Sequence, residues 1–206
     1  MQLSEQELQR RNVREELQAM GIDPYPAELF EINTSSEEVK QNFEKHPENF
    51  KSVSIAGRLM TRRIMGNATF AEIQDSAGRI QIYVRRDDIC PGEDKTLYNT
   101  VFKKMMDIGD IIGIKGFVFK TQVGELSIHV TDFKILTKSL KPIPVVREVE
   151  DEEGNKKTYD ALTDPETRYR LRYLDLIVYP HVKDAFVNRT KLVNSMREYL
   201  ADKEYL

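Results

Sequence analysis

The spacing of apolar and polar residues changes along the chain, and the change separates a helical region from a β-rich one. Residues 1–50 have apolar positions at helical spacing and are predicted to form helices. Ser4 and Glu7 have the spacing of a capping box, and Gly21 stands where a helix-ending glycine is expected. A second helix is predicted to begin near Thr34, which starts another S/T-x-x-E pattern.

From Lys51 onward apolar residues alternate with polar ones, which is typical of strands. A bulge or bend is expected at Gly57, inside the first strand. Three strands, a helix and two more strands follow one another, which is the order of an OB-fold, a five-stranded Greek-key barrel that binds oligonucleotides. The predicted strands cover 53–65, 68–75, 79–84, 111–121 and 125–136, and the helix covers 96–106.

The alternation also predicts which side chains face outward. Phe70 falls on the polar face of the second strand, and Gln81 falls on the polar face of the third. Arg62 is assigned to the same outer surface from its place in the first strand, with Glu125 nearby. An OB-fold binds its ligand on the outer face of strands two and three, so this surface is the predicted recognition site.

Each of these side chains has a use on single-stranded RNA. Phe70 can stack on an unpaired base, while Arg62, Gln81 and Glu125 can bond to its Watson–Crick edge. Each also has a structural explanation: Phe70 as a lone surface aromatic, Gln81 as a solvated amide, Arg62 as a partner of Glu72, and Glu125 as a turn residue. Their gathering on one face favours RNA.

Composition and charge narrow the class of protein. Hydrophobic residues make up 40% of the chain and charged residues 32%, which is compatible with a folded core. Residues 51–138 carry 14 Lys+Arg against 10 Asp+Glu, so a mildly basic module lies within a chain of net charge -3. One cysteine excludes an internal disulfide, and no Cys/His cluster suggests a metal site. No apolar run is long enough for a membrane helix, and the charged N-terminus is no signal peptide, so we expect a cytoplasmic protein.

Several runs resemble one family, the bacterial class II lysyl-tRNA synthetases. IAGRLMTRRIMGNATFAEIQDSAGRIQIYV and GDIIGIKGFVFKTQVGELSIHV resemble the anticodon-binding OB-fold of that family. DPETRYRLRYLDLIVYP resembles the start of its catalytic domain, and FVNRTKLVNSMREYLADKEYL resembles the helix of class II motif 1, although residue 204 is Glu where the family usually has Gly. The resemblance implies a stacking role for Phe70 and anticodon hydrogen bonds from Arg62, Gln81 and Glu125. Candidate contacts to the RNA backbone are Arg58, Arg63 and Arg79.

The resemblance and the composition together predict four segments. Asp164 and Pro165 fit the N-cap and first residue of a helix that includes residues 168–176. The GNKK run (154–157) predicts a hairpin turn in a connection rich in charge and proline. The segments are an N-terminal helical extension (1–50), the OB-fold domain (51–138), an interdomain connection (139–165) and a truncated start of a class II catalytic domain (166–206).

Only 68 residues follow residue 138, too few for an ATP-binding synthetase core, so an N-terminal fragment of a larger enzyme is expected. The resemblance implies that the full-length enzyme is a lysine–tRNA ligase that uses ATP and Mg²⁺ and forms a homodimer. For the fragment we expect binding to the anticodon stem-loop of tRNA(Lys), no catalytic residues, no cofactor and a monomer or weak dimer. The alternatives are the anticodon-binding part of an aspartyl- or asparaginyl-tRNA synthetase and a stand-alone OB module for single strands.

Overall fold

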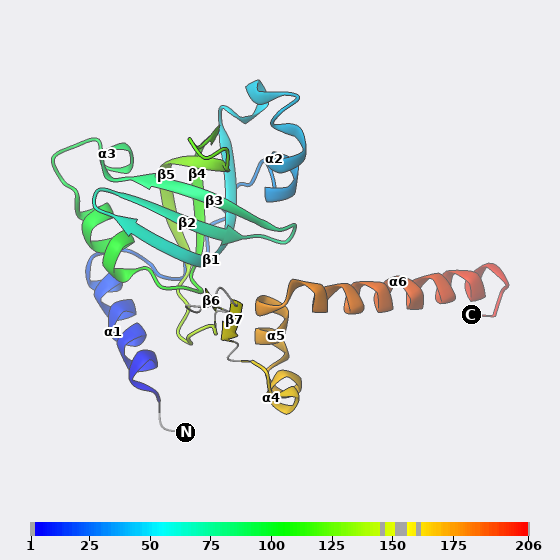
Figure 1. The fold of residues 1–206 in the computed structure, drawn as a ribbon. Coiled ribbons are helices and arrows are strands. Elements are labelled where there is room, and N and C mark those ends of the chain that lie inside the picture. The colour runs from blue at the N-terminus through cyan, green and yellow to red at the C-terminus, as the bar shows by residue number, and fades with distance from the viewer. Residues whose placement is uncertain (1–2, 145–146, 151–155, 160–161, 206) are drawn as a thin grey trace. The chain divides into compact units, whose positions relative to one another are not determined.

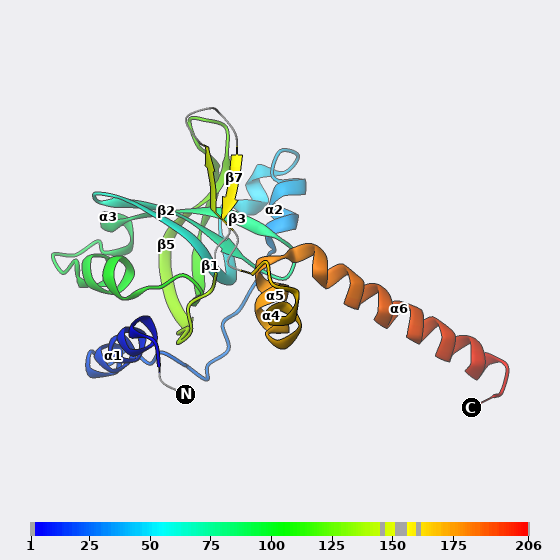
Figure 2. The same cartoon turned by 60° about the horizontal axis from the view of Figure 1, so that its bottom comes forward.

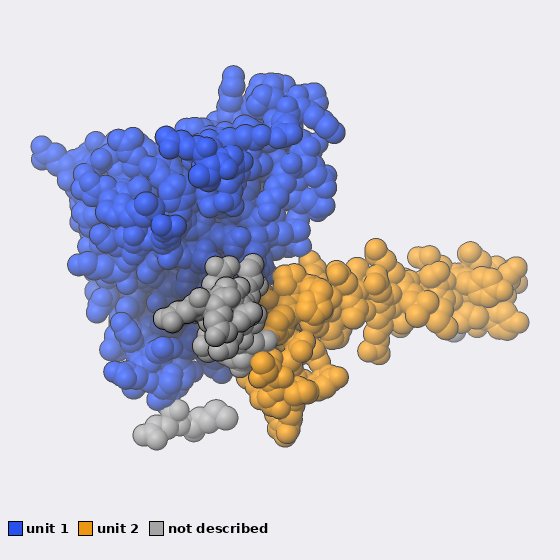
Figure 3. Space-filling model, viewed as in Figure 1, with its two compact units in different colours: residues 1–142 blue, residues 143–206 orange. Residues whose placement is uncertain are grey.

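The structure is a computed structural model with two compact units, residues 1–142 and residues 143–206, which Figure 3 colours separately. The predicted division into four segments stays a prediction. The residues described are 3–144, 147–150, 156–159 and 162–205.

The first unit is built on a closed barrel of five strands (Figure 1). Strands β1, β2 and β3 form an antiparallel meander, β3 pairs with β5 in parallel, and β4 joins β5 to β1. This arrangement confirms the predicted OB-fold. The strands are β1 (Val53–Met65), β2 (Ala68–Gln74), β3 (Arg79–Arg85), β4 (Ile111–Lys120) and β5 (Leu126–Thr137).

Alternate residues of the strands fill the barrel. Ile73, Ile80, Ile82, Ile114 and Ile128 are each at most 1% exposed. The strand residues between them point outward, because successive side chains of a strand leave on opposite faces. Full burial of an aliphatic side chain contributes about 1.5–3 kcal/mol, so this alternation fixes the faces of β2, β3 and β5.

The irregularity in β1 is not where the sequence suggested. The register against β2 shifts between Leu59 and Thr61, so the bulge lies at Met60. Gly57 serves a different purpose, because a Cβ there would lie 2.9 Å from the carbonyl oxygen of Gln74. The glycine allows two backbones to approach closely, and the bulge beyond it moves every later side chain of β1 to the opposite face.

Helix α1 (Glu5–Ala19) begins and ends as predicted. Ser4 and Glu7 form the capping box, with the Glu7 N–H donating to Ser4 Oγ at 3.3 Å. Gly21 has φ +77°, and the next residue, Ile22, donates its N–H to the carbonyl of Leu17 at 2.9 Å. These bonds close the helix in the manner of a Schellman motif, where glycine is favoured because it adopts positive φ without strain.

Helix α2 (Ser36–Asn42) begins one residue later than the sequence suggested. Ser35 is its N-cap and accepts the N–H of Glu38 at 3.2 Å, whereas the hydroxyl of Thr34 donates to the Glu38 carboxylate at 3.1 Å. Two short helices, η1 (Pro47–Phe50) and α3 (Arg86–Ile89), were not predicted.

The helix between β3 and β4, η2 (Leu97–Met105), is a π-helix where an α-helix was predicted. The Met106 N–H donates to the carbonyl of Val101, five residues earlier, at 3.1 Å. This wider winding buries both Tyr98 and Phe102, whose rings stack 6.1 Å apart. Helix α1 lies beside η2 in both ribbon views (Figures 1 and 2).

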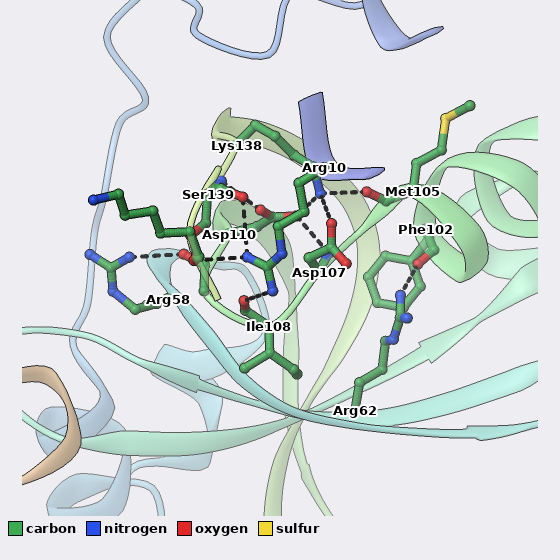
Figure 4. Close-up of polar contacts among 12 residues, drawn as sticks. Arg10, Arg58, Arg62, Phe102, Met105, Asp107, Ile108, Asp110, Lys138 and Ser139 are labelled. Atoms are coloured by element: carbon green, nitrogen blue, oxygen red, sulfur yellow. Dashed lines mark hydrogen bonds and ion pairs between the residues drawn. The ribbon is translucent and has the colours of Figure 1, made fainter. Parts of the chain in front are cut away.

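A buried ion cluster joins the loop before β4 to the chain that follows β5 (Figure 4). The Lys138 ammonium is fully buried and donates to Asp107 at 2.6 Å, to Asp110 at 2.8 Å and to the carbonyl of Met105 at 2.6 Å. Burial raises the pKa of Asp110, and the Lys138 ammonium together with the N–H groups of Asp107 and Ser139 opposes that rise. We call Lys138, Asp107 and Asp110 the basal ion cluster.

Arg10 attaches α1 to this region (Figure 4). Its guanidinium donates to the carbonyls of Ile108, Ser139 and Lys141 at 3.0–3.1 Å. One side chain therefore holds the N-terminal helix against both segments that the basal ion cluster joins.

The second unit begins with two paired strands, β6 (Arg147–Glu150) and β7 (Lys156–Tyr159). They are antiparallel, although 151–155, where the predicted GNKK turn begins, lie outside the described residues. Three helices follow: α4 (Pro165–Arg170), α5 (Arg172–Val178) and α6 (Pro180–Asp202).

The predicted N-cap of α4 is confirmed, because Asp164 accepts the N–H of Thr167 at 2.8 Å. The single helix predicted through residue 176 is wrong, since it is interrupted at Leu171 between α4 and α5. Arg168 and Arg172 both bind the buried carboxylate of Asp175, which ties the two helices together.

Helix α6 begins six residues before the predicted motif 1 helix and has no buried residue. Its end takes the shape that glycine usually provides. Glu204 has φ +61°, its N–H donates to Ala201, and the N–H of Tyr205 donates to Leu200 at 3.0 Å. Position 204, where the resembled family usually has Gly, is therefore a left-handed helix end.

Candidate nucleic-acid interface

A groove of about 990 Å³ lies on the outer face of β1–β3 and the β4–β5 turn. OB-folds bind single strands on this face. Most of its surface is apolar or aromatic, with polar groups at its edges. The lining residues are Thr61, Arg63, Met65, Ala68, Phe70, Ala71, Glu72, Gln81, Tyr83, Phe119, Thr121, Gln122, Val123 and Glu125.

Phe70 lies in this groove, as predicted. It is paired across the sheet with Tyr83, and the two rings lie 4.9 Å apart at an angle of 47°. Tyr83 supports one edge of the Phe70 ring, which remains partly exposed. The ring is therefore held in place and can offer a surface for stacking.

Gln81 is fixed in a defined orientation on β3. Its side-chain oxygen accepts the hydroxyl of Ser127 at 2.7 Å, and Ser127 is fully buried on the neighbouring strand β5. The orientation of an amide is inferred from its partners, and this bond assigns the oxygen to Ser127. The amide N–H groups are then the donors that Gln81 can offer to a ligand.

Glu125 lies at the end of the turn between β4 and β5. The turn is closed by the Thr121 N–H, which donates to the Glu125 carbonyl at 2.9 Å, and by the Glu125 N–H, which donates to the Thr121 hydroxyl at 3.0 Å. Gly124 has φ +86° at the same turn. The backbone of Glu125 is thus held in place, while its side chain is exposed at the edge of the groove.

The placement of Arg62 on this surface is wrong. Arg62 pairs with Ala71, whose side chain is inside the barrel, and its guanidinium donates to the carbonyl of Phe102 at 2.7 Å (Figure 4). Burial lowers its pKa, and the nearby carboxylates of Asp107 and Asp110 oppose that change. The cause of the error is the bulge in β1, because a shift of one residue exchanges the two faces of a strand.

Arg63 takes the place that the sequence assigned to Arg62. It pairs with Phe70 across β1 and β2, lines the groove and is exposed. The sequence placed Arg63 only among candidate contacts to the RNA backbone. The two other arginines of that set bond within the protein: Arg58 donates to the carbonyl of Gly109 at 2.8 Å, and Arg79 donates to Gln74 at 2.8 Å.

Glu72 is a groove carboxylate whose charge is balanced within the chain. Its pairing with Arg62 was an alternative from the sequence, but its partner is Arg79, at 3.4 Å. A balanced Glu72 opposes an anionic ligand less than a free carboxylate would. The groove therefore combines an aromatic platform, donors from Gln81 and Arg63, and an acceptor from Glu125.

Comparison with known proteins agrees with this geometry. Residues 53–136 match the family of OB-fold nucleic acid binding domains. The whole chain is 55% identical over 208 residues to a lysine–tRNA ligase of Porphyromonas gingivalis, and it covers 35% of that protein. Over 99% of the chain it is 54% identical to a lysine–tRNA ligase of Christiangramia forsetii, of which it covers 34%. It is 51% identical to one of Azobacteroides pseudotrichonymphae, of which it covers 40%.

The chain thus spans roughly a third of the length of the curated relatives it matches. The resemblance to lysine–tRNA ligases and the OB-fold predicted from the sequence are both confirmed. None of the helices in the described part of the chain combines the length and the apolar composition that a membrane span requires.

Proposed function

We propose that this chain is the anticodon-binding part of a lysine–tRNA ligase and that it binds the anticodon stem-loop of tRNA(Lys). The observation that carries the proposal is the arrangement of Phe70 between the donors of Gln81 and Arg63 and the acceptor of Glu125, in the groove of residues that match a nucleic-acid-binding OB-fold. Similarity to lysine–tRNA ligases over the whole chain supports the choice of tRNA.

The groove has the chemistry to recognise uracil, which is abundant in the lysine anticodon by family resemblance. Uracil presents an N3–H donor between two carbonyl acceptors. The carboxylate of Glu125 can only accept, so it suits N3–H, whereas Gln81 and Arg63 can donate to the carbonyls. Phe70 would stack on the face of the same base.

The full-length protein would join lysine to tRNA with ATP and Mg²⁺, as a cytoplasmic homodimer. In that protein, this chain would supply recognition of the tRNA anticodon and no catalytic residue, and it would need no cofactor of its own. Purified chain is therefore expected to catalyse no lysine-dependent ATP–pyrophosphate exchange and to sediment as a monomer or weak dimer. Measurable exchange would contradict the expectation that this chain lacks catalytic residues, and a tight dimer at nanomolar concentration would contradict the expected oligomeric state.

The direct test is a competition titration at one fixed salt concentration. The labelled ligand is the anticodon stem-loop of tRNA(Lys), and the competitors are stem-loops with the aspartate and asparagine anticodons and an unstructured RNA of equal length. Preference for the lysine loop supports the proposal. Preference for the aspartate or asparagine loop would indicate the related synthetases, and equal affinity for all four would indicate a general single-strand module.

A further inference from the structure

Aromatic side chains continue across the sheet beyond the groove. Tyr83 of β3 lies opposite Phe70 of β2, His129 of β5 lies opposite Tyr83, and Phe117 of β4 lies opposite His129. The ring centroids along this row are 4.9, 5.2 and 4.7 Å apart. Neighbouring strands are about 4.8 Å apart, so the row crosses four strands in register.

At the far end of the row two rings are stacked on each other. Phe117 and His129 are nearly parallel, at 15°, whereas Phe119 meets His129 at 62° and supports it from the side. His129 Nε2 lies 2.6 Å from a carboxylate oxygen of Asp88, which fixes the imidazole ring. We call Tyr83, Phe117, Phe119 and His129 the aromatic ledge.

Cross-strand aromatic packing accounts for the inner members of the ledge, since rings on adjacent strands stabilise a sheet. Phe117, the outermost ring, packs on His129 in this way and still remains 38% exposed at the end of the row. Lys115 lies two residues before Phe117 on the same face of β4 and is also exposed. Asp132 lies opposite Lys115 in the register of β4 and β5, but no carboxylate of the described residues forms an ion pair with Lys115, so its ammonium can donate to a phosphate.

We infer that the aromatic ledge binds a further unpaired base of the same RNA strand, outside the anticodon triplet and stacked on Phe117, and that Lys115 binds a phosphate beside it. The inference rests on the proposed function, because the groove around Phe70 holds the triplet. Recognition on the ledge is tolerant of sequence, since every base has a face that can stack and Nε2 of His129 is already paired with Asp88. The ledge therefore lengthens the bound strand without adding specificity.

The test compares short and extended RNAs on the full chain. The probes are fluorescein-labelled UUU and hexanucleotides that extend UUU by three adenines or three uracils at either end. Phe117→Ala is expected to weaken hexanucleotide binding about tenfold, equally for adenine and uracil extensions, and to leave UUU binding unchanged. Phe117→Leu is expected to behave like Phe117→Ala, because it keeps apolar volume but has no ring, whereas Phe117→Tyr is expected to bind like the parent.

A second arm measures charge. Lys115→Gln is expected to reduce the slope of log affinity against log salt by about 0.7 for the hexanucleotide and not for UUU, which corresponds to one phosphate contact on a single strand. Lys134→Gln is the matched control, because this lysine of β5 is paired with Glu28. Phe186→Ala, which removes a ring of similar exposure from the second unit, controls for loss of an exposed aromatic.

Comparison of Phe70→Ala with Phe117→Ala tests the groove and the aromatic ledge independently. Phe70→Ala is expected to weaken both lengths of RNA. If it does so while Phe117→Ala weakens neither, or weakens both equally, the ledge does not bind a base beyond the triplet and the proposed function stands. If Phe70→Ala has no effect on either length while circular dichroism shows an intact fold, the proposed groove is wrong, and a length-dependent loss in Phe117→Ala would still support the ledge.

Discussion

Charged side chains are buried and paired at one place on the barrel and exposed at another. At the basal ion cluster, Lys138 is surrounded by protein acceptors at 2.6–2.8 Å and has no exposure to solvent. In the groove, Arg63 and Glu125 line the surface and are exposed, and no ion pair within the described residues involves either of them. Arg62 and Arg63 are neighbours in sequence, yet Arg62 bonds to a backbone carbonyl of η2 and Arg63 faces the groove.

The difference indicates what each place does. A buried charge must find its partners within the chain, because an unpaired one costs several kcal/mol. Polar groups at the groove have no such requirement, since water satisfies them until a ligand replaces it. Substitutions at the basal ion cluster should therefore change stability, and substitutions in the groove should change binding.

The largest effect is expected from Lys138→Met. This change leaves the buried carboxylate of Asp110 without its cation, and breaking a buried pair in this way costs about 3–5 kcal/mol. Urea denaturation would measure the loss in free energy of unfolding. Lys134→Met is the control on an exposed lysine, and Lys138→Met combined with Asp110→Asn should recover part of the stability. A loss in free energy of unfolding below about 1 kcal/mol would mean that the basal ion cluster stabilises the fold no more than an exposed ion pair does.

Phe70→Ala is expected to weaken RNA binding and to leave stability nearly unchanged. Removing one stacking platform should weaken binding of the tRNA(Lys) stem-loop by about 1–3 kcal/mol, while the unfolding midpoint changes little because the ring is partly exposed. Fluorescence titration and thermal melting measure the two quantities on one sample. Tyr169→Ala, which removes an exposed ring from the second unit, should change neither. Binding equal to the parent with an intact fold would show that the ligand lies elsewhere.

The next effect in size is the difference in affinity between uracil and cytosine at the central anticodon position. In the proposed complex, replacing the central uracil of the anticodon by cytosine would put a lone pair opposite the carboxylate of Glu125, which should cost at least about 1.4 kcal/mol, or tenfold. Glu125→Gln should reduce this preference, since an amide can donate to the cytosine nitrogen as well as accept. Two stem-loops that differ only at this base, titrated at one salt concentration, measure it. Equal affinities for the parent chain would reduce the groove to a non-specific one.

Much of the barrel could be predicted from the sequence because its pattern is local. Inside-outside alternation in β2 and β3 placed Phe70 and Gln81 correctly, and the order of elements predicted the OB-fold. Both facts follow from a period of two residues in strands that are buried on one face. The same logic failed in β1, where the bulge at Met60 reversed the faces of Arg62 and Arg63.

Other features depend on tertiary context that a local pattern does not contain. The basal ion cluster brings Lys138 to carboxylates about thirty residues earlier, and the spacing of such residues carries no recognisable signal. The π-helical winding of η2 could not be predicted from the sequence either, because its apolar spacing also fits an α-helix. Gly57 correctly predicted an irregular strand. The error was to place the bulge at the glycine, which instead allows the close approach to Gln74, while the bulge lies at Met60.

The smallest expected change in binding separates the two adjacent arginines and tests the bulge in β1. Arg63→Gln should weaken stem-loop binding about threefold and lower the salt slope by about 0.7, because the lost charge faces the RNA, with no change in unfolding free energy. Arg62→Gln should do the reverse: binding by the folded chain is kept, while stability falls by about 1.5–3 kcal/mol because a charged donor to the Phe102 carbonyl is lost. If Arg62→Gln instead reduced the salt slope and Arg63→Gln did not, β1 would have the unbulged register that the sequence alone suggested.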